Sequence, residues 1–190
     1  MRTASFAFMT TFALTLAGAQ GCSPSTKNED QYWTVHQTEI TEYGTRWPGF
    51  KALLAARLAQ ARPAWEAALA IGNDKEKAQR MHDANALLAD GLLTRLGEVK
   101  YKSKGIDETI DKINGLRLPM SRAGDRDEAV ASAQRSVSDV ERAMVAAHPA
   151  SEAEAMTLLE EQISKLISDG GAADRAYKRL KPEPDKKKKK

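Results

Sequence analysis

An all-α fold, an antiparallel four-helix bundle of two helical hairpins and a short connector helix, is predicted by three features of this sequence. The chain after residue 22 is rich in Ala, Leu, Glu, Lys and Arg, which have high helix propensity. Its apolar residues recur at spacings of three and four, the period of one helix face. Breaks that contain Gly or Pro divide this pattern, as they do between helices.

The first 21 residues predict a secretory signal peptide. Arg2 precedes an apolar run over residues 4–17, and small residues then lead to Cys22, the only cysteine of the chain. The run is shorter than the ~20 apolar residues with which a helix crosses a bilayer. We therefore expect segment 1–21 to direct export and to be removed.

This layout resembles the signal peptides of bacterial lipoproteins, whose cleavage box has a Leu, small residues and a lipid-bearing Cys. The box here reads Ala19-Gln20-Gly21-Cys22, and Gln20 departs from the family pattern. The resemblance implies that Cys22 is acylated and anchors the protein at the periplasmic side of the cell envelope. Ser23 favours, by the same resemblance, the outer membrane over the inner membrane. Ordinary cleavage after Ala19, at an A-x-A site, is the alternative.

Residues 22–30 are predicted to form a flexible tether, because they are polar and have no apolar period. The helical domain is predicted over residues 31–180. Its first helix covers residues 31–43, and a second covers 48–69 with a kink at Pro63.

A Gly-Asn-Asp turn at residues 72–74 combines a helix stop with a helix cap, so a third helix is predicted over 74–101. Residues 102–121 are predicted to connect the two hairpins. Within this connector, isoleucines at helical spacing predict a short helix over 107–114.

The last two helices carry the clearest apolar seam, with alternating spacings of three and four. Its residues in the first of them are Val130, Ala133, Val137, Val140, Met144 and Ala147. We therefore expect Val137 to be buried and its neighbour Ser136 to be exposed. A His-Pro-Ala break follows at 148–150, Ser151 and Glu154 form a capping box, and glycines at 170–171 are expected to interrupt the last helix. An elongated spacer, in which the hairpins share no core, is the alternative architecture.

The motifs of helical-bundle cofactors are absent from the sequence. No Glu-x-x-His motif for a di-iron site and no C-x-x-C-H motif for haem occurs, and the three histidines show no metal-ligand spacing. The methionines at seam positions, such as Met81 and Met144, are interpreted as core residues rather than haem ligands. We therefore expect no cofactor and no metal, and a protein that is not an enzyme. Catalysis by carboxylates that converge in the fold is a third alternative.

Two groups of residues are candidates for contact with a partner. The first is an aromatic cluster, which can anchor a partner or fill the end of the bundle. Its members are Tyr32, Trp33, Tyr43, Trp47 and Phe50. The second is the basic tail over 181–190, predicted to be disordered, which ends in Lys186, Lys187, Lys188, Lys189 and Lys190.

The charge of the chain is divided between these parts. The tail carries +4, while the domain is near −2, although the whole chain has a formal charge of +3. Lysines in a run are attracted to anionic surfaces such as lipid headgroups. Nucleic acid is not an expected partner, because the protein is expected to be exported.

Together these features predict a lipid-anchored periplasmic helical-bundle protein. Its expected role is that of a non-catalytic interaction, scaffold or adaptor subunit, held to the membrane by its N-terminal lipid. An envelope protein or an anionic surface is the expected partner. The alternative is a module that binds an apolar small ligand inside the bundle.

Overall fold

The computed structural model describes residues 24–181, and within this range the protein is built of helices alone. The bounds of the α-helices are α1 (Thr26–Arg46), α2 (Lys51–Leu69), α3 (Asp74–Ala89), α4 (Leu92–Asn114), α5 (Ala123–Ala146) and α6 (Glu152–Leu180). Two short 3-10 helices, η1 (Pro48–Phe50) and η2 (Met120–Arg122), precede α2 and α5. The predicted all-α class is confirmed.

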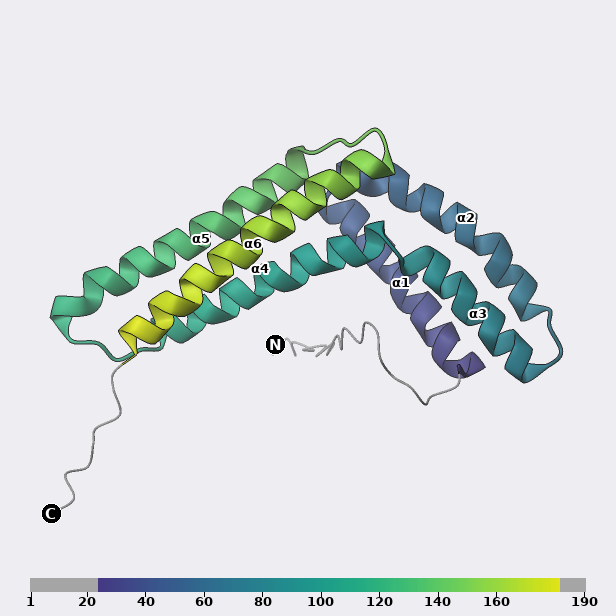
Figure 1. Cartoon of the computed structure of the whole chain (residues 1–190), viewed down its shortest axis with the longest axis horizontal. Helices are drawn as coiled ribbons and strands as arrows, with labels where there is room; N and C mark the ends of the chain where they lie inside the picture. Colours follow the sequence, from purple (N-terminus) through teal and green to yellow (C-terminus); the bar gives the residue numbers. More distant parts are fainter. Residues whose placement is uncertain (1–23, 182–190) are drawn as a thin grey trace, which may run out of the picture.

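The six helices pack as two groups of three, which meet at an angle (Figure 1). The first group is α1–α3, and the second is α4–α6. In the second group, α4 and α6 run in the same direction and α5 runs against both. The predicted four-helix arrangement is not confirmed. The hairpin of α2 and α3 packs with α1, and the hairpin of α5 and α6 packs with α4.

The helix predicted over 74–101 is broken between α3 and α4, and this break separates the two groups. Gly91 has a φ of 78°, a left-handed conformation that favours glycine. The guanidinium of Arg57 stabilises the break, because its Nη1 donates to the Leu87 carbonyl at 3.0 Å and its Nη2 to the Asp90 carbonyl. Nη2 also donates to the Glu152 carboxylate at 2.8 Å. One side chain of α2 therefore binds the end of α3 and the start of α6.

The short connector helix predicted over 107–114 is the second half of α4. The intervening residues continue the helix because one face of α4 is buried against α6, where Ile106 packs beside Gly170. The same packing keeps α6 continuous through Gly170 and Gly171, where an interruption was expected. The predicted connector helix and the predicted interruption at Gly170-Gly171 were both wrong, because tertiary burial keeps each helix continuous and offsets the low helix propensity of glycine.

The helical domain also begins earlier than predicted. Residues 26–30, expected to belong to a tether over 22–30, form the first turn of α1. Ser25 caps this helix by accepting a hydrogen bond from the Asn28 amide at 3.3 Å. Glu29 is buried in the first turn, where the amide of Asn85 on α3 binds its carboxylate. A cap and a buried contact at its start explain why α1 forms here.

The two groups have distinct cores that meet near the junction. The core of the first group contains the indole rings of Trp33 and Trp65, which stack in parallel with centroids 4.5 Å apart. The larger core continues from Trp47 and Phe50 at the junction along α4, α5 and α6. Both junction side chains are completely buried, so the first group is packed directly against the second.

The seam of α5 is rotated slightly from its predicted position. Ala133, Val140 and Met144 are buried as predicted, but Val137 is only half-buried and Ser136 is buried. The expectation that Ser136 is exposed was wrong. Since α5 contacts both α4 and α6, its buried face is wider than a single seam, and Ser136 faces α6.

Candidate functional site

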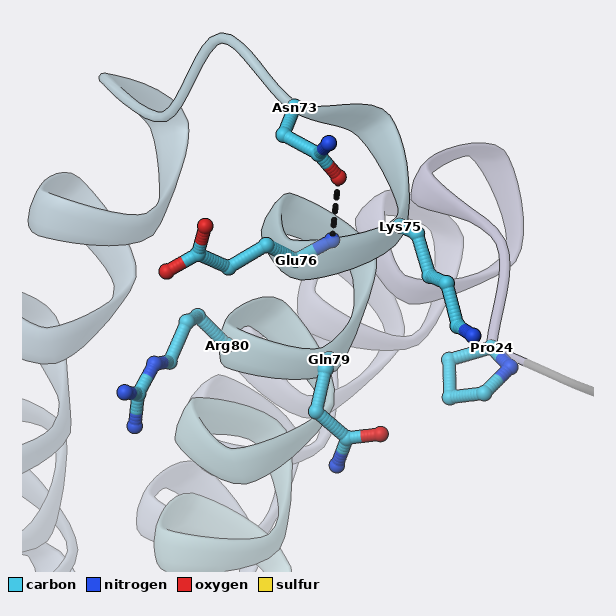
Figure 2. Close-up of a pocket in the computed structure, with 6 residues that line it drawn as sticks. All are labelled: Pro24, Asn73, Lys75, Glu76, Gln79 and Arg80. Carbon is cyan, nitrogen blue, oxygen red and sulfur yellow. Dashed lines mark hydrogen bonds between the residues drawn. The ribbon is translucent and has the colours of Figure 1, made fainter.

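The N-terminal tip of the first helix group is a candidate site because it lies beside the start of the described chain. We define this tip as Pro24, the turn over 70–73 and the first turns of α3 over 74–80. A shallow hollow of about 630 Å³ opens there. Its lining residues are Pro24, Asn73, Lys75, Glu76, Gln79 and Arg80 (Figure 2).

The start of α3 fixes the side chains of this tip. Asn73 caps the helix, because its Oδ1 accepts a hydrogen bond from the Glu76 amide at 3.0 Å. Lys75 extends toward Pro24, whereas Glu76 and Arg80 project from another side of the helix (Figure 2). Basic and acidic side chains thus alternate at the tip, which has no single sign of charge.

A buried carboxylate lies next to this tip. Glu29 accepts from the Asn85 amide nitrogen at both its Oε2 (2.8 Å) and its backbone carbonyl (2.9 Å). The Nδ1 of His82 lies 3.4 Å from Glu29 Oε1. Asn85 Oδ1 is buried and has no hydrogen-bond partner among the residues described. These contacts fix the start of α1 on α3.

A second hollow, of about 650 Å³, opens between α5 and α6. Its floor has small residues, including Ala133 and Ala173, and its rim has charges of both signs. Ser136 donates a hydrogen bond to Asp169 across the hollow, and Lys165 lies 3.8 Å from Asp139. These cross-helix contacts join α5 to α6.

The junction between the two groups contains a cluster of polar side chains around Glu141 of α5. Arg46 binds this carboxylate through Nε at 3.0 Å and Nη2 at 2.8 Å, and the indole nitrogen of Trp47 donates to it at 3.1 Å. The hydrogen bond to Glu141 raises the pKa of the Arg46 guanidinium above its ordinary value. Burial, followed by the charges of Glu39 and Glu42, raises the pKa of the Tyr43 phenol well above 10.0. The cluster holds the end of α1 against α5.

The predicted aromatic cluster lies mostly in the cores. Trp33, Tyr43, Trp47 and Phe50 are buried, and only Tyr32 is exposed, at 54%. The four buried side chains fill the two cores and are not available as a contact surface. Their burial removes these four residues as candidates for contact with a partner, and it agrees with the other interpretation, that the cluster fills the bundle.

The methionines and histidines considered as cofactor or metal ligands are also located by the structure. Met81 and Met144 are buried in the cores, as interpreted from the sequence. Each of His36 and His82 lies near a single glutamate. Across residues 24–181, no group of three or more His, Cys, Asp and Glu side chains is arranged to hold a metal ion.

The predicted lipid site Cys22 and the lysines 186–190 fall outside residues 24–181, so both stay predictions. None of the described helices combines the length and the hydropathy needed to span a membrane.

Sequence reasoning did not identify the N-terminal tip. The only sequence signal for this tip is the helix start at Asn73-Asp74. Because residues 22–30 were predicted to be a flexible tether, there was no reason to expect this turn near Cys22.

The chain matches no known family model, and neither a curated protein nor a solved structure is significantly similar to it.

Proposed function

We propose that this protein is a lipid-anchored periplasmic scaffold or adaptor with a non-catalytic role at the cell envelope, preferentially at the outer membrane. The observation that carries the proposal is the position of Pro24. This residue lies at the N-terminal tip, and only Ser23 separates it from Cys22. A lipid on Cys22 would therefore attach the first helix group to the membrane by one end.

The packing of the two helix groups supports a scaffold. Arg57 links α2 to the α3–α4 break and to α6, and Arg46 links α1 to α5. These contacts oppose bending at the junction, as do the buried Trp47 and Phe50. A body of this kind would hold its second helix group at a fixed position relative to the anchor.

The charged side chains best placed for chemistry also support a structural role. Arg46 and Glu141 bind each other, and the carboxylate of Glu29 is bound by Asn85. Each of these groups thus has a function in joining two helices. The use of these charges to join helices favours an interaction protein over an envelope enzyme.

The binding of an apolar small ligand is the second candidate function. The hollow between α5 and α6 supports it, since its floor has several alanines and its volume is about 650 Å³. The charged rim of this hollow, with Asp139, Lys165 and Asp169, favours polar groups instead. We therefore rank this function below the scaffold.

The anchor is tested by mass spectrometry of the mature N-terminus, together with Cys22→Ala. We expect an acylated Cys22 at the N-terminus of the native protein, and an unprocessed or mislocalised precursor for the variant. The control is the chain from Ser23 onward, exported by an ordinary signal peptide, which should reach the soluble periplasmic fraction. A mature chain that begins at Gln20 without lipid would contradict the anchor.

The scaffold role is tested by crosslinking in intact cells. We expect the anchored protein to copurify with a reproducible envelope partner, and the exported soluble control to recover less of it. Equal recovery by both forms would show that the anchor does not contribute to the interaction.

A further inference from the structure

The length of chain between Cys22 and the folded domain limits where the N-terminal tip can lie. Pro24 is two residues from Cys22, and a fully extended chain covers at most about 3.6 Å per residue, or roughly 7 Å. The headgroup layer on one side of a bilayer is about 5 to 8 Å thick. A lipidated Cys22 would thus bring Pro24, and the surface around it, to the level of the headgroups.

The surface next to Pro24 has the chemistry to contact phospholipids. Lys75 extends toward Pro24 at the edge of the hollow, and the guanidinium of Arg80 lies further along the same helix (Figure 2). Both residues are exposed. Nearby, Leu69 at the end of α2 is 45% exposed, and Ile71 in the α2–α3 connection is half-buried. Cationic and apolar groups at one end of a helical body are the combination that binds at a bilayer interface.

We propose that the N-terminal tip is a bilayer-contact surface, on which Lys75 binds the phosphates of anionic phospholipids. The inference rests on the proposed lipidation of Cys22, which brings the tip to the bilayer. The alternating charges at the start of α3 make this contact weak by itself. The tip therefore binds the bilayer only when the lipid on Cys22 holds it there. Its effect is to orient the first helix group on the membrane and to direct the second group to a defined position.

A fluorophore at the tip tests this contact. Once Cys22 is acylated, an introduced cysteine is the only free thiol of the chain. Gly72→Cys places a nitrobenzoxadiazole label in the α2–α3 turn, where nothing lies within 4 Å of an added β-carbon. Ala150→Cys places the same label on the exposed α5–α6 loop, at the junction and away from the tip (Figure 1).

Both labelled proteins are incorporated into vesicles of phosphatidylethanolamine and phosphatidylglycerol that contain headgroup-nitroxide lipid. We expect a blue-shifted emission and strong quenching for the label at position 72, and neither for the label at position 150. Adding Lys75→Glu should reduce the quenching at position 72, whereas Lys104→Glu, on an exposed face of α4, should not.

The outcomes separate the tip from the anchor. Mass spectrometry of the N-terminal peptide, on the same preparation, shows whether Cys22 carries the lipid. A preparation without the lipid overturns the proposed anchor and the tip contact together. A lipidated preparation in which both labels are equally quenched overturns the tip contact alone, and an unchanged signal with Lys75→Glu overturns the role of Lys75.

Discussion

Gly49 lies directly against the backbone of Ala147, and a β-carbon at Gly49 would overlap the Ala147 carbonyl oxygen. Gly49 belongs to the 3-10 helix before α2, and Ala147 is the C-cap residue that follows α5. The two groups of helices thus meet through backbone as well as through side chains. Because backbone cannot move aside as a flexible side chain can, this contact defines the separation of the groups at the junction.

The first prediction is that Gly49→Ala destabilises the protein by about 1 to 3 kcal/mol or more, since overpacking forces the backbone at the junction to shift. The matched control is Gly105→Ala. Gly105 lies inside α4 with nothing within 4 Å of an added β-carbon, so alanine should stabilise by about 0.5 to 1 kcal/mol. Urea denaturation followed by circular dichroism measures both, and a Gly49→Ala variant as stable as the native protein would contradict the close contact.

The junction also shows why the sequence predicted the class of fold but not its arrangement. The apolar spacing in α5 and α6 depends on local periodicity, and it identified Val140 and Met144 as core residues. The break at Gly91 depends on Arg57, more than 30 positions earlier, whose guanidinium binds the carbonyl groups of Leu87 and Asp90. A pairing of this kind leaves no periodic signal, so the sequence predicted one long helix instead of two.

The second prediction concerns the face of α5. Ser136→Asp should destabilise the protein by about 1 to 3 kcal/mol at neutral pH, because it puts a second carboxylate beside Asp169 in a buried place. Ser138→Asp, on an exposed part of the same helix, should change stability little. Thermal melting of the two variants checks this difference. Equal melting temperatures would show that Ser136 is not buried against α6.

Protonation should reverse part of this effect. In the Ser136→Asp variant the pKa of one carboxyl of the pair rises, since two adjacent carboxylates repel each other. The stability lost at neutral pH should therefore be partly regained as pH falls, which Ser138→Asp should not show.

The third prediction uses the buried phenol of Tyr43. Burial, with the charges of Glu39 and Glu42, raises its folded-state pKa well above the ordinary 10.0. Its contribution to stability is therefore fully present below about pH 10 and is lost as pH rises further, because only the unfolded chain releases the proton. The expected loss is at most about 1.4 kcal/mol per pH unit.

Tyr43→Phe should remove this alkaline dependence. Tyr101→Phe is the control, because the Tyr101 side chain is 57% exposed and the substitution removes a phenol that is not buried in the core. Denaturant titrations at several values of pH above 9 measure the slopes. If Tyr43→Phe and the native protein lose stability in parallel as the pH rises, the Tyr43 phenol ionises in the folded protein. That result would contradict its burial.

The candidate sites differ in how far the sequence could predict them. The aromatic residues between 32 and 50 are close together in the sequence, but the structure divides the buried ones between two cores. Composition cannot tell a buried ring from an exposed one. The stack of Trp33 on Trp65 forms only when α1 and α2 pack together. To predict the N-terminal tip, one would have to know where α1 begins. That start depends on the long-range contact between Glu29 and Asn85, which local sequence does not reveal.

The last prediction concerns the lysine-rich segment after Lys181. Lys181 follows α6, and the C-terminal end of α6 lies far from the start of α1 (Figure 1). An anionic surface bound by lysines 186–190 would therefore be contacted at a place separate from the lipid anchor. The soluble chain from Ser23 onward should bind vesicles that contain phosphatidylglycerol, and this binding should fall steeply with salt, since exposed charges are screened over about 8 Å at physiological ionic strength.

Deletion of residues 186–190 should abolish this binding while the helicity and the melting temperature stay the same. A matched control replaces the five lysines with five glutamines, which keeps the length and removes the charge. Cosedimentation with vesicles at increasing salt measures all three proteins. If the truncated chain binds as well as the full chain, the tail does not hold the second group to a surface. The soluble domain would then bind through its folded body, and Lys75 and Arg80 at the N-terminal tip would be the first residues to substitute.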